Sequence, residues 1–140
     1  MRKRTRAREY ALQLLYQVDV AERSPSEMYV EFWKAFPCEN PVREFAERLV
    51  TGTLEKLPEI DKLLARYTEN WNLERMAVVD RNILRFATYE LRFMDDSPPK
   101  VSINEAVNLA KKYSQEESGK FVNGVLDKIC HRETTKLNKI

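Results

Sequence analysis

The sequence has little glycine, histidine and cysteine, and it lacks any long apolar run. Three glycines and six prolines occur among 140 residues, and runs of alternating β-branched residues are absent, so strands are not expected. No apolar stretch approaches the roughly 20 residues that a membrane-spanning helix needs. Glu9, Gln13 and Asp19 interrupt the segment that follows the basic start, which argues against a secretory signal and favours the cytoplasm.

Side chains that could carry chemistry are equally sparse. His131 is the single histidine, and Cys38 and Cys130 lie far apart in the sequence. No group of Cys and His has metal-ligand spacing, so no zinc site is predicted. Two reduced, buried thiols are the better interpretation in a reducing compartment. A nucleophile needs a base beside it, and no glycine-rich loop follows a strand. The sequence therefore predicts a protein that is not an enzyme and uses no cofactor.

Helical periodicity is what the sequence does contain, because apolar residues recur three and four positions apart. The chain is long enough for one compact domain. We predict an all-α fold, with a single helical domain over residues 1–132 and a polar tail over 133–140. Asn72 is expected to cap the fifth helix, and Ser102 with Glu105 to form a capping box at the sixth. About seven helices are expected, over approximately residues 3–22, 27–36, 42–57, 58–67, 73–94, 102–113 and 118–130.

Positive charge is concentrated at the amino end. The first eight residues hold five cations and no acid, whereas the whole chain carries only +2. These cations are Arg2, Lys3, Arg4, Arg6 and Arg8. At 100° per residue they spread around a helix, so we expect this start not to be buried on any side. They also oppose the helix macrodipole. The asymmetry favours a nucleic-acid partner, and a solvated basic tail is the alternative interpretation.

Aromatic side chains close to these cations are candidates for stacking on bases, at about 1–3 kcal/mol for each base. Tyr16 lies on the same predicted helix as the basic segment, and Phe121 follows Lys120. Both have a structural alternative. The spacing of Phe121 and Val125 is also that of a helix core, and the Tyr16 hydroxyl could reach a partner at the core edge.

Four stretches of the sequence carry a resemblance to a known family. They are residues 6–17, 80–91, 103–107 and 121–128, and they read RAREYALQLLYQ, DRNILRFATYEL, INEAV and FVNGVLDK. In this order, over about residues 4–130, they resemble the NusB family of bacterial transcription antitermination factors.

The resemblance implies a helical domain that binds boxA-type single-stranded RNA in nascent ribosomal RNA transcripts. It implies that the ribosomal protein NusE binds with it, inside an RNA polymerase antitermination complex. Carried onto this chain, the implied RNA contacts are Lys3, Arg4, Arg6, Arg8, Tyr16, Glu117, Lys120 and Phe121. The implied partner contacts are Asp80, Arg81 and Arg85.

Two other functions remain open at this point. The domain could be an accessory part of an RNA-modifying enzyme, which binding of S-adenosylmethionine would reveal. It could also be a protein adaptor whose basic tail only solubilises it, which binding of a ribosomal protein without RNA preference would reveal. Aromatic-rich helical faces also allow a homodimer.

Overall fold

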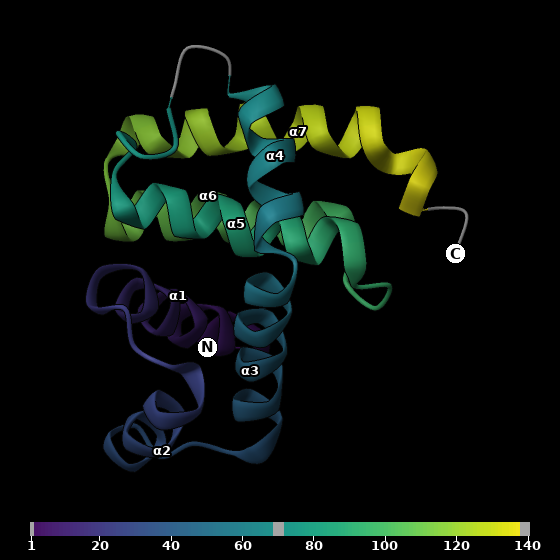
Figure 1. The fold of residues 1–140 in the computed structure, drawn as a ribbon. Helices are drawn as coiled ribbons and strands as arrows, with labels where there is room; N and C mark the ends of the chain where they lie inside the picture. Colours follow the sequence, from purple (N-terminus) through teal and green to yellow (C-terminus); the bar gives the residue numbers. More distant parts are fainter. Residues whose placement is uncertain (1, 69–71, 138–140) are drawn as a thin grey trace.

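The computed structural model describes residues 2–68 and 72–137, and within these ranges it contains seven helices and no strand (Figure 1). The all-α prediction is confirmed. The helices are α1 (Lys3–Ala21), α2 (Pro25–Ala35), α3 (Asn40–Glu55), α4 (Leu57–Tyr67), α5 (Val78–Phe93), α6 (Pro99–Tyr113) and α7 (Glu116–Leu137). None of the helices in the described residues is long and apolar enough to cross a membrane.

The helices form two groups that share one core. Helices α1, α2 and α3 lie together in the lower half of Figure 1, and α4 to α7 lie above them. Helix α5 joins the groups, because it packs against α1 and α3 on one side and against α4, α6 and α7 on the other. Buried apolar side chains from all seven helices meet in a single cluster. The amino end of α1 is therefore held against α3, α5 and α6.

Two predicted helix starts are wrong. Helix α5 begins at Val78, five residues after the expected start, and residues 73–76 form turns and a bend instead. The Asn72 side chain accepts a hydrogen bond from the Glu74 amide at 2.9 Å, so it stabilises this turn rather than capping a helix. Helix α6 begins at Pro99, so Ser102 lies inside it and the expected capping box is absent. A proline suits the first helical position, because the amide that it lacks would have no partner within the helix.

The end of the last helix also differs from the prediction. Helix α7 continues to Leu137 rather than ending near Cys130. Glu133, the first residue of the expected polar tail, is buried and accepts a hydrogen bond from the Tyr67 hydroxyl at 2.7 Å. The helix therefore extends because α4 supplies a partner for its polar side chain. Cys38 and Cys130 are not joined in a disulfide, as expected, but they are half-buried rather than buried.

Candidate nucleic-acid interface

The amino end of α1 has no acidic residue in its first turn, so its cations are not balanced within the helix. Acids from elsewhere in the chain form ion pairs with two cations of this first turn. Lys3 Nζ lies 2.9 Å from the Glu39 carboxylate, and Arg4 Nη2 lies 2.9 Å from Asp96 Oδ2. The hydrogen bond from Lys3 lowers the pKa of Glu39. Lys3 and Arg4 nevertheless remain about half exposed, so both stay within reach of a polyanion.

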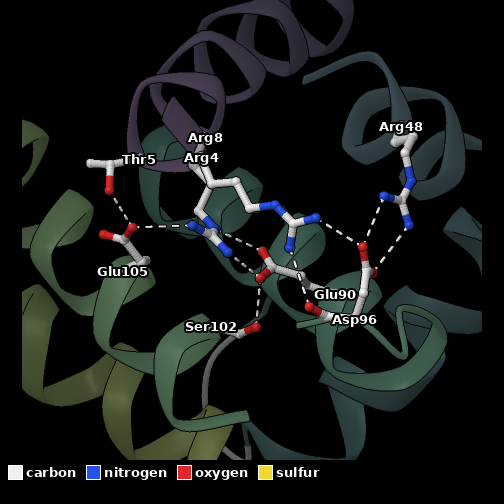
Figure 2. A network of polar contacts seen from close by, with 8 residues as sticks. All are labelled: Arg4, Thr5, Arg8, Arg48, Glu90, Asp96, Ser102 and Glu105. Atoms are coloured by element: carbon white, nitrogen blue, oxygen red, sulfur yellow. Dashed lines mark hydrogen bonds and ion pairs between the residues drawn. The ribbon is translucent and has the colours of Figure 1, made fainter. Parts of the chain in front are cut away.

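Arg8 is buried, with only 2% of its side chain exposed (Figure 2). Its Nε and Nη2 donate to the two oxygens of Glu90 on α5, at 3.0 and 2.6 Å, and its Nη1 donates to Glu105 on α6 at 3.1 Å. The expectation that no side of the basic start is buried is therefore wrong at Arg8. Two carboxylates satisfy the guanidinium internally, so its charge is not presented to solvent.

The residues expected to cap α6 belong to this same buried network. The Ser102 hydroxyl donates to Glu90 at 2.6 Å, and the Thr5 hydroxyl donates to the Glu105 oxygen that also accepts from Arg8 (Figure 2). Donors from α1 and α6 therefore complete the hydrogen bonding of both carboxylates. The network fixes α1 to α5 and α6 beneath the exposed cations.

A second polar cluster lies closer to the surface. Asp96, between α5 and α6, accepts hydrogen bonds from Arg4 and from Arg48 of α3 (Figure 2). These two hydrogen bonds, that from Arg48 above all, lower the pKa of Asp96 from 3.8 to about 2. The guanidiniums of Arg4 and Arg48 lie 4.3 and 5.9 Å from the centre of the Phe45 ring, within the range of a cation–π contact.

The remaining predicted residues of α1 differ in exposure. Arg6 is half-buried and donates to the Tyr10 hydroxyl at 3.4 Å, and its guanidinium lies 5.9 Å from the centre of that ring. Tyr16 is 43% exposed, so its ring is available to a ligand. The structural alternative, in which the Tyr16 hydroxyl reaches a partner at the core edge, has no hydrogen bond among the described residues to support it.

The start of α7 brings residues of both predicted surfaces together. Glu117 and Lys120 are exposed, whereas Phe121 is half-buried and packs against the core. Glu117 and Phe121 line a pocket of about 260 Å³, and Asp80 of α5 lines it too. Asp80 is buried and accepts a hydrogen bond from the Ser118 hydroxyl at 3.0 Å. Sequence reasoning assigned Asp80 to the partner surface, but the structure places it beside the predicted RNA residues.

The two segments predicted to bind RNA are connected through the end of α6. Glu9 of α1 accepts hydrogen bonds from Lys112 Nζ at 2.7 Å and from the Tyr113 hydroxyl at 3.0 Å. Both Lys112 and Tyr113 are exposed, and they immediately precede the pocket at the start of α7. Sequence reasoning did not select them, although the run Lys111-Lys112-Tyr113 combines two cations with an aromatic ring. Arg48 was missed as well.

Arg81 and Arg85, predicted to contact a partner protein, make ion pairs within the chain. Arg81 donates to Asp19 of α1 at 2.8 Å, and Arg85 donates to both oxygens of Asp61 of α4 at 2.8 and 2.9 Å. Burial opposes ionisation of Asp19, but hydrogen bonds from Arg81 and Asn82 hold its pKa below the ordinary value. These arginines fix α5 to α1 and α4. They also line a surface pocket with Asp61, so part of each remains accessible.

No group of three or more His, Cys, Asp or Glu in residues 2–68 and 72–137 is arranged to hold a metal ion. What the surface of these residues offers is charge and aromatic rings. Lys3, Arg4 and Arg6 lie at one end of α1, and Tyr16 lies further along the same helix. Lys112, Tyr113 and Lys120 follow near the start of α7. Such a surface can neutralise phosphates and stack on bases.

Comparisons with known proteins give a consistent result. A model described as the NusB family matches residues 5–131. The chain is 54% identical over 129 residues to the transcription antitermination protein NusB of Anaeromyxobacter sp. (strain Fw109-5), covering 91% of this chain and 90% of the relative. It is 50% identical over 126 residues to the NusB protein of Pelotomaculum thermopropionicum, covering 90% and 88%.

Solved structures agree with these sequence matches. T. maritima NusB superposes with a TM-score of 0.85 at 40% identity, covering 96% of each chain. A crystal structure of the antitermination factors NusB and NusE in complex with double-stranded RNA contains a chain that matches with a TM-score of 0.84 at 35% identity. That match covers 92% of this chain and 96% of the other.

Proposed function

The chain belongs to the NusB family, and from that premise we propose that it is a transcription antitermination factor that binds RNA. Its RNA ligand is boxA-type single-stranded RNA in nascent ribosomal RNA transcripts. Its protein partner is the ribosomal protein NusE, and the two act together within the RNA polymerase antitermination complex. It works by binding, without catalysing a reaction, in the cytoplasm where transcripts are made.

One observation supports RNA binding above the others: exposed cations and an exposed aromatic ring lie along a helix that is anchored to the core. The exposed cations are Lys3 and Arg4, with the half-buried Arg6 beside them, and the exposed ring is that of Tyr16. Anchoring through Arg8 means that little conformational freedom is lost when RNA binds. Phosphates bound at the cations give affinity, and bases stacked on aromatic rings such as Tyr16 and Phe121 give preference for sequence.

The NusE surface is proposed at the accessible parts of Arg81 and Arg85, beside the pocket that they line with Asp61. A solved relative in which NusB and NusE occur together supports the choice of partner. Because both arginines already have carboxylate partners, NusE would bind a preformed charged surface rather than order a flexible one. Asp80 would contribute from the neighbouring pocket at the start of α7.

The decisive experiment is a titration of short RNAs at several salt concentrations, with and without NusE. The RNAs are a boxA single strand, a scrambled single strand of the same composition, and a duplex. With Lys3, Arg4, Arg6 and Lys120 as phosphate contacts, a plot of log affinity against log salt should have a slope near −2.8, using about 0.7 for each phosphate. Affinity should fall about fiftyfold between 50 and 200 mM salt.

The outcomes separate the candidate functions. Tighter binding of boxA than of the scrambled strand, strengthened by NusE, supports the proposal. Equal binding of every RNA, or an affinity independent of salt, overturns it. Binding of NusE without any RNA preference would support the protein adaptor instead. Binding of S-adenosylmethionine would support the accessory domain of an enzyme.

A further inference from the structure

We propose that Arg4 and Arg48 form a phosphate-binding site for RNA, and that the Asp96 carboxylate occupies this site in the free protein. The inference rests on the proposed RNA-binding function and adds to it a residue, Arg48, from outside the basic start of the chain. Asp96 acts as an internal competitor that an RNA phosphate displaces.

The geometry of the cluster is that of an anion site built from two helices. Arg4 of α1 and Arg48 of α3 direct their guanidiniums at one carboxylate from different sides (Figure 2). Arg4 Nη2 lies 2.9 Å from Asp96 Oδ2, and Arg48 Nη1 and Nη2 lie 3.2 and 3.3 Å from Oδ2 and Oδ1. Arg4 also donates to the Asp96 carbonyl oxygen at 3.2 Å. A phosphate presents tetrahedral oxygens that two guanidiniums can bind in the same manner.

The two arginines do not depend on Asp96 alone for their position. Both guanidiniums lie within cation–π range of the buried Phe45 ring, at 4.3 and 5.9 Å from its centre. Arg8 lies 5.2 Å from the same ring and is fixed by Glu90. The ring therefore keeps the arginines close together when the carboxylate leaves, so the site is preformed for a second anion.

Exchange of one anion for another is feasible because the cluster is half exposed. The side chains of Arg4, Arg48 and Asp96 are 44, 49 and 46% exposed. Exposed ion pairs contribute only about 0–1 kcal/mol, so breaking them costs little. The carboxylate stays ionised down to a pH of about 2, the pKa that its two arginines give it. Protonation therefore does not empty the site near neutral pH, and displacement by phosphate must do so.

The first experiment removes the competitor. We expect Asp96→Asn to bind a boxA single strand about threefold to fivefold more tightly than the wild type at 100 mM salt, from the weight of an exposed ion pair. The matched control is Asp95→Asn, which removes the same charge one residue away. Asp95 is exposed and makes no ion pair within the described residues. The control should change affinity less than twofold.

The second experiment removes the newly assigned cation. Arg48→Ala should weaken RNA binding about twofold to fivefold, because Arg4 alone is then left to bind the phosphate. Arg66→Ala is the control, because Arg66 is also an exposed, ion-paired arginine but lies on α4. Arg66→Ala should leave the affinity for RNA unchanged. Circular dichroism of each variant establishes that the helices are intact, and the Arg48 variants test the site even if Asp96→Asn does not fold.

The outcomes distinguish this inference from the proposed function. If the wild type shows no boxA preference, the proposed function fails, whatever the variants do. If the wild type prefers boxA while Asp96→Asn binds no more tightly than Asp95→Asn, the competitor role is wrong. If Arg48→Ala binds RNA as tightly as the wild type does, Arg48 makes no phosphate contact and the site is wrong.

Discussion

Burial of an arginine changes what its charge does, because a buried guanidinium holds helices together and is not accessible to a ligand. Arg8 sits in a run of cations, yet Glu90 and Glu105 bind it in the interior. Burying a charge without a partner is costly, so each member of this network stabilises the fold only while the others are present. Its neighbours Lys3 and Arg4 have exposed partners that an RNA could replace.

Replacing Arg8 should therefore destabilise the protein strongly. Arg8→Met leaves Glu90 buried and unpaired, and the free energy of unfolding should fall by about 3–5 kcal/mol. Urea unfolding followed by circular dichroism measures this. Arg23→Ala is the control, because Arg23 pairs with Glu31 at 2.6 Å on the surface, and it should cost less than about 1 kcal/mol. Equal losses in the two variants would contradict the anchoring role.

The low pKa of the Asp96 carboxylate predicts how the stability of the fold depends on pH. Its folded pKa of about 2 lies below the ordinary 3.8. Because this pKa is lower in the folded state, the ionised carboxylate stabilises the fold at pH values above the ordinary pKa. This stability is lost as the pH falls through the folded pKa. NMR titration of the Asp96 side chain should give an apparent pKa of about 2, and in Arg48→Ala it should move towards 3.8. An unchanged value in the variant would mean that Arg48 does not hold the carboxylate.

The contrast between Arg8 and Arg4 also shows which properties of single residues can be predicted from the sequence. The charge run identified α1 as the cationic helix, but nothing local separates a buried arginine from an exposed one. The acids that decide it lie 82 and 97 residues further along the chain. Arg48 escaped notice for the same reason, because its neighbours in the sequence are not basic and only the fold brings it to Arg4.

At the scale of elements, Gly52 lets the side chain of Tyr89 on α5 lie directly against the backbone of α3. A Cβ atom at Gly52 would overlap the ring of Tyr89 on α5, which stacks on Phe93 at 5.5 Å between ring centres. Gly52 therefore sets the separation of the two helices. Gly124 of α7 is also helical, but a Cβ there would meet nothing within 4 Å.

The two glycines should respond to alanine in opposite directions. Gly52→Ala should lower the free energy of unfolding by about 1–3 kcal/mol, because the Tyr89 ring must move within a packed interface. Gly124→Ala should raise it by up to about 1 kcal/mol, since alanine is the better helix former and no contact opposes it. Thermal or urea unfolding of both variants measures the difference. A higher free energy of unfolding in Gly52→Ala would show that the Tyr89 ring moves aside without destabilising the interface.

Helix existence followed from the sequence more reliably than helix ends. Apolar periodicity predicted all seven helices, and Pro58 placed the start of α4 within one residue. Asn72 and Ser102 misled the prediction, because their side chains suit a helix cap but also suit other partners. Asn72 closes a turn, and Ser102 donates to Glu90. A tertiary contact therefore takes the Ser102 hydroxyl, whereas a competing local turn takes the Asn72 side chain.

For the whole molecule, the single core predicts cooperative unfolding. Trp33 of α2 packs edge-on against Tyr10 of α1 at 5.6 Å between ring centres. Trp33 belongs to the buried cluster that includes residues of α5 and α7, and Tyr10 packs against that cluster. In a Trp71→Phe background Trp33 is the only tryptophan. Its fluorescence and the far-ultraviolet circular dichroism should then give the same urea midpoint. An earlier fluorescence transition would show that α2 unfolds separately.

The long sequence distance between Arg8 and its acids has a consequence for synthesis. Helix α1 leaves the ribosome before α5 and α6 do, and Glu105 is made 97 residues after Arg8. Until Glu90 and Glu105 have both emerged, Arg8 lacks part of the carboxylate pair that binds it in the folded protein. Synthesis of α6 is thus the step after which the amino end of α1 can pack as it does in the folded protein. A chain released before that step would lack a carboxylate that binds Arg8.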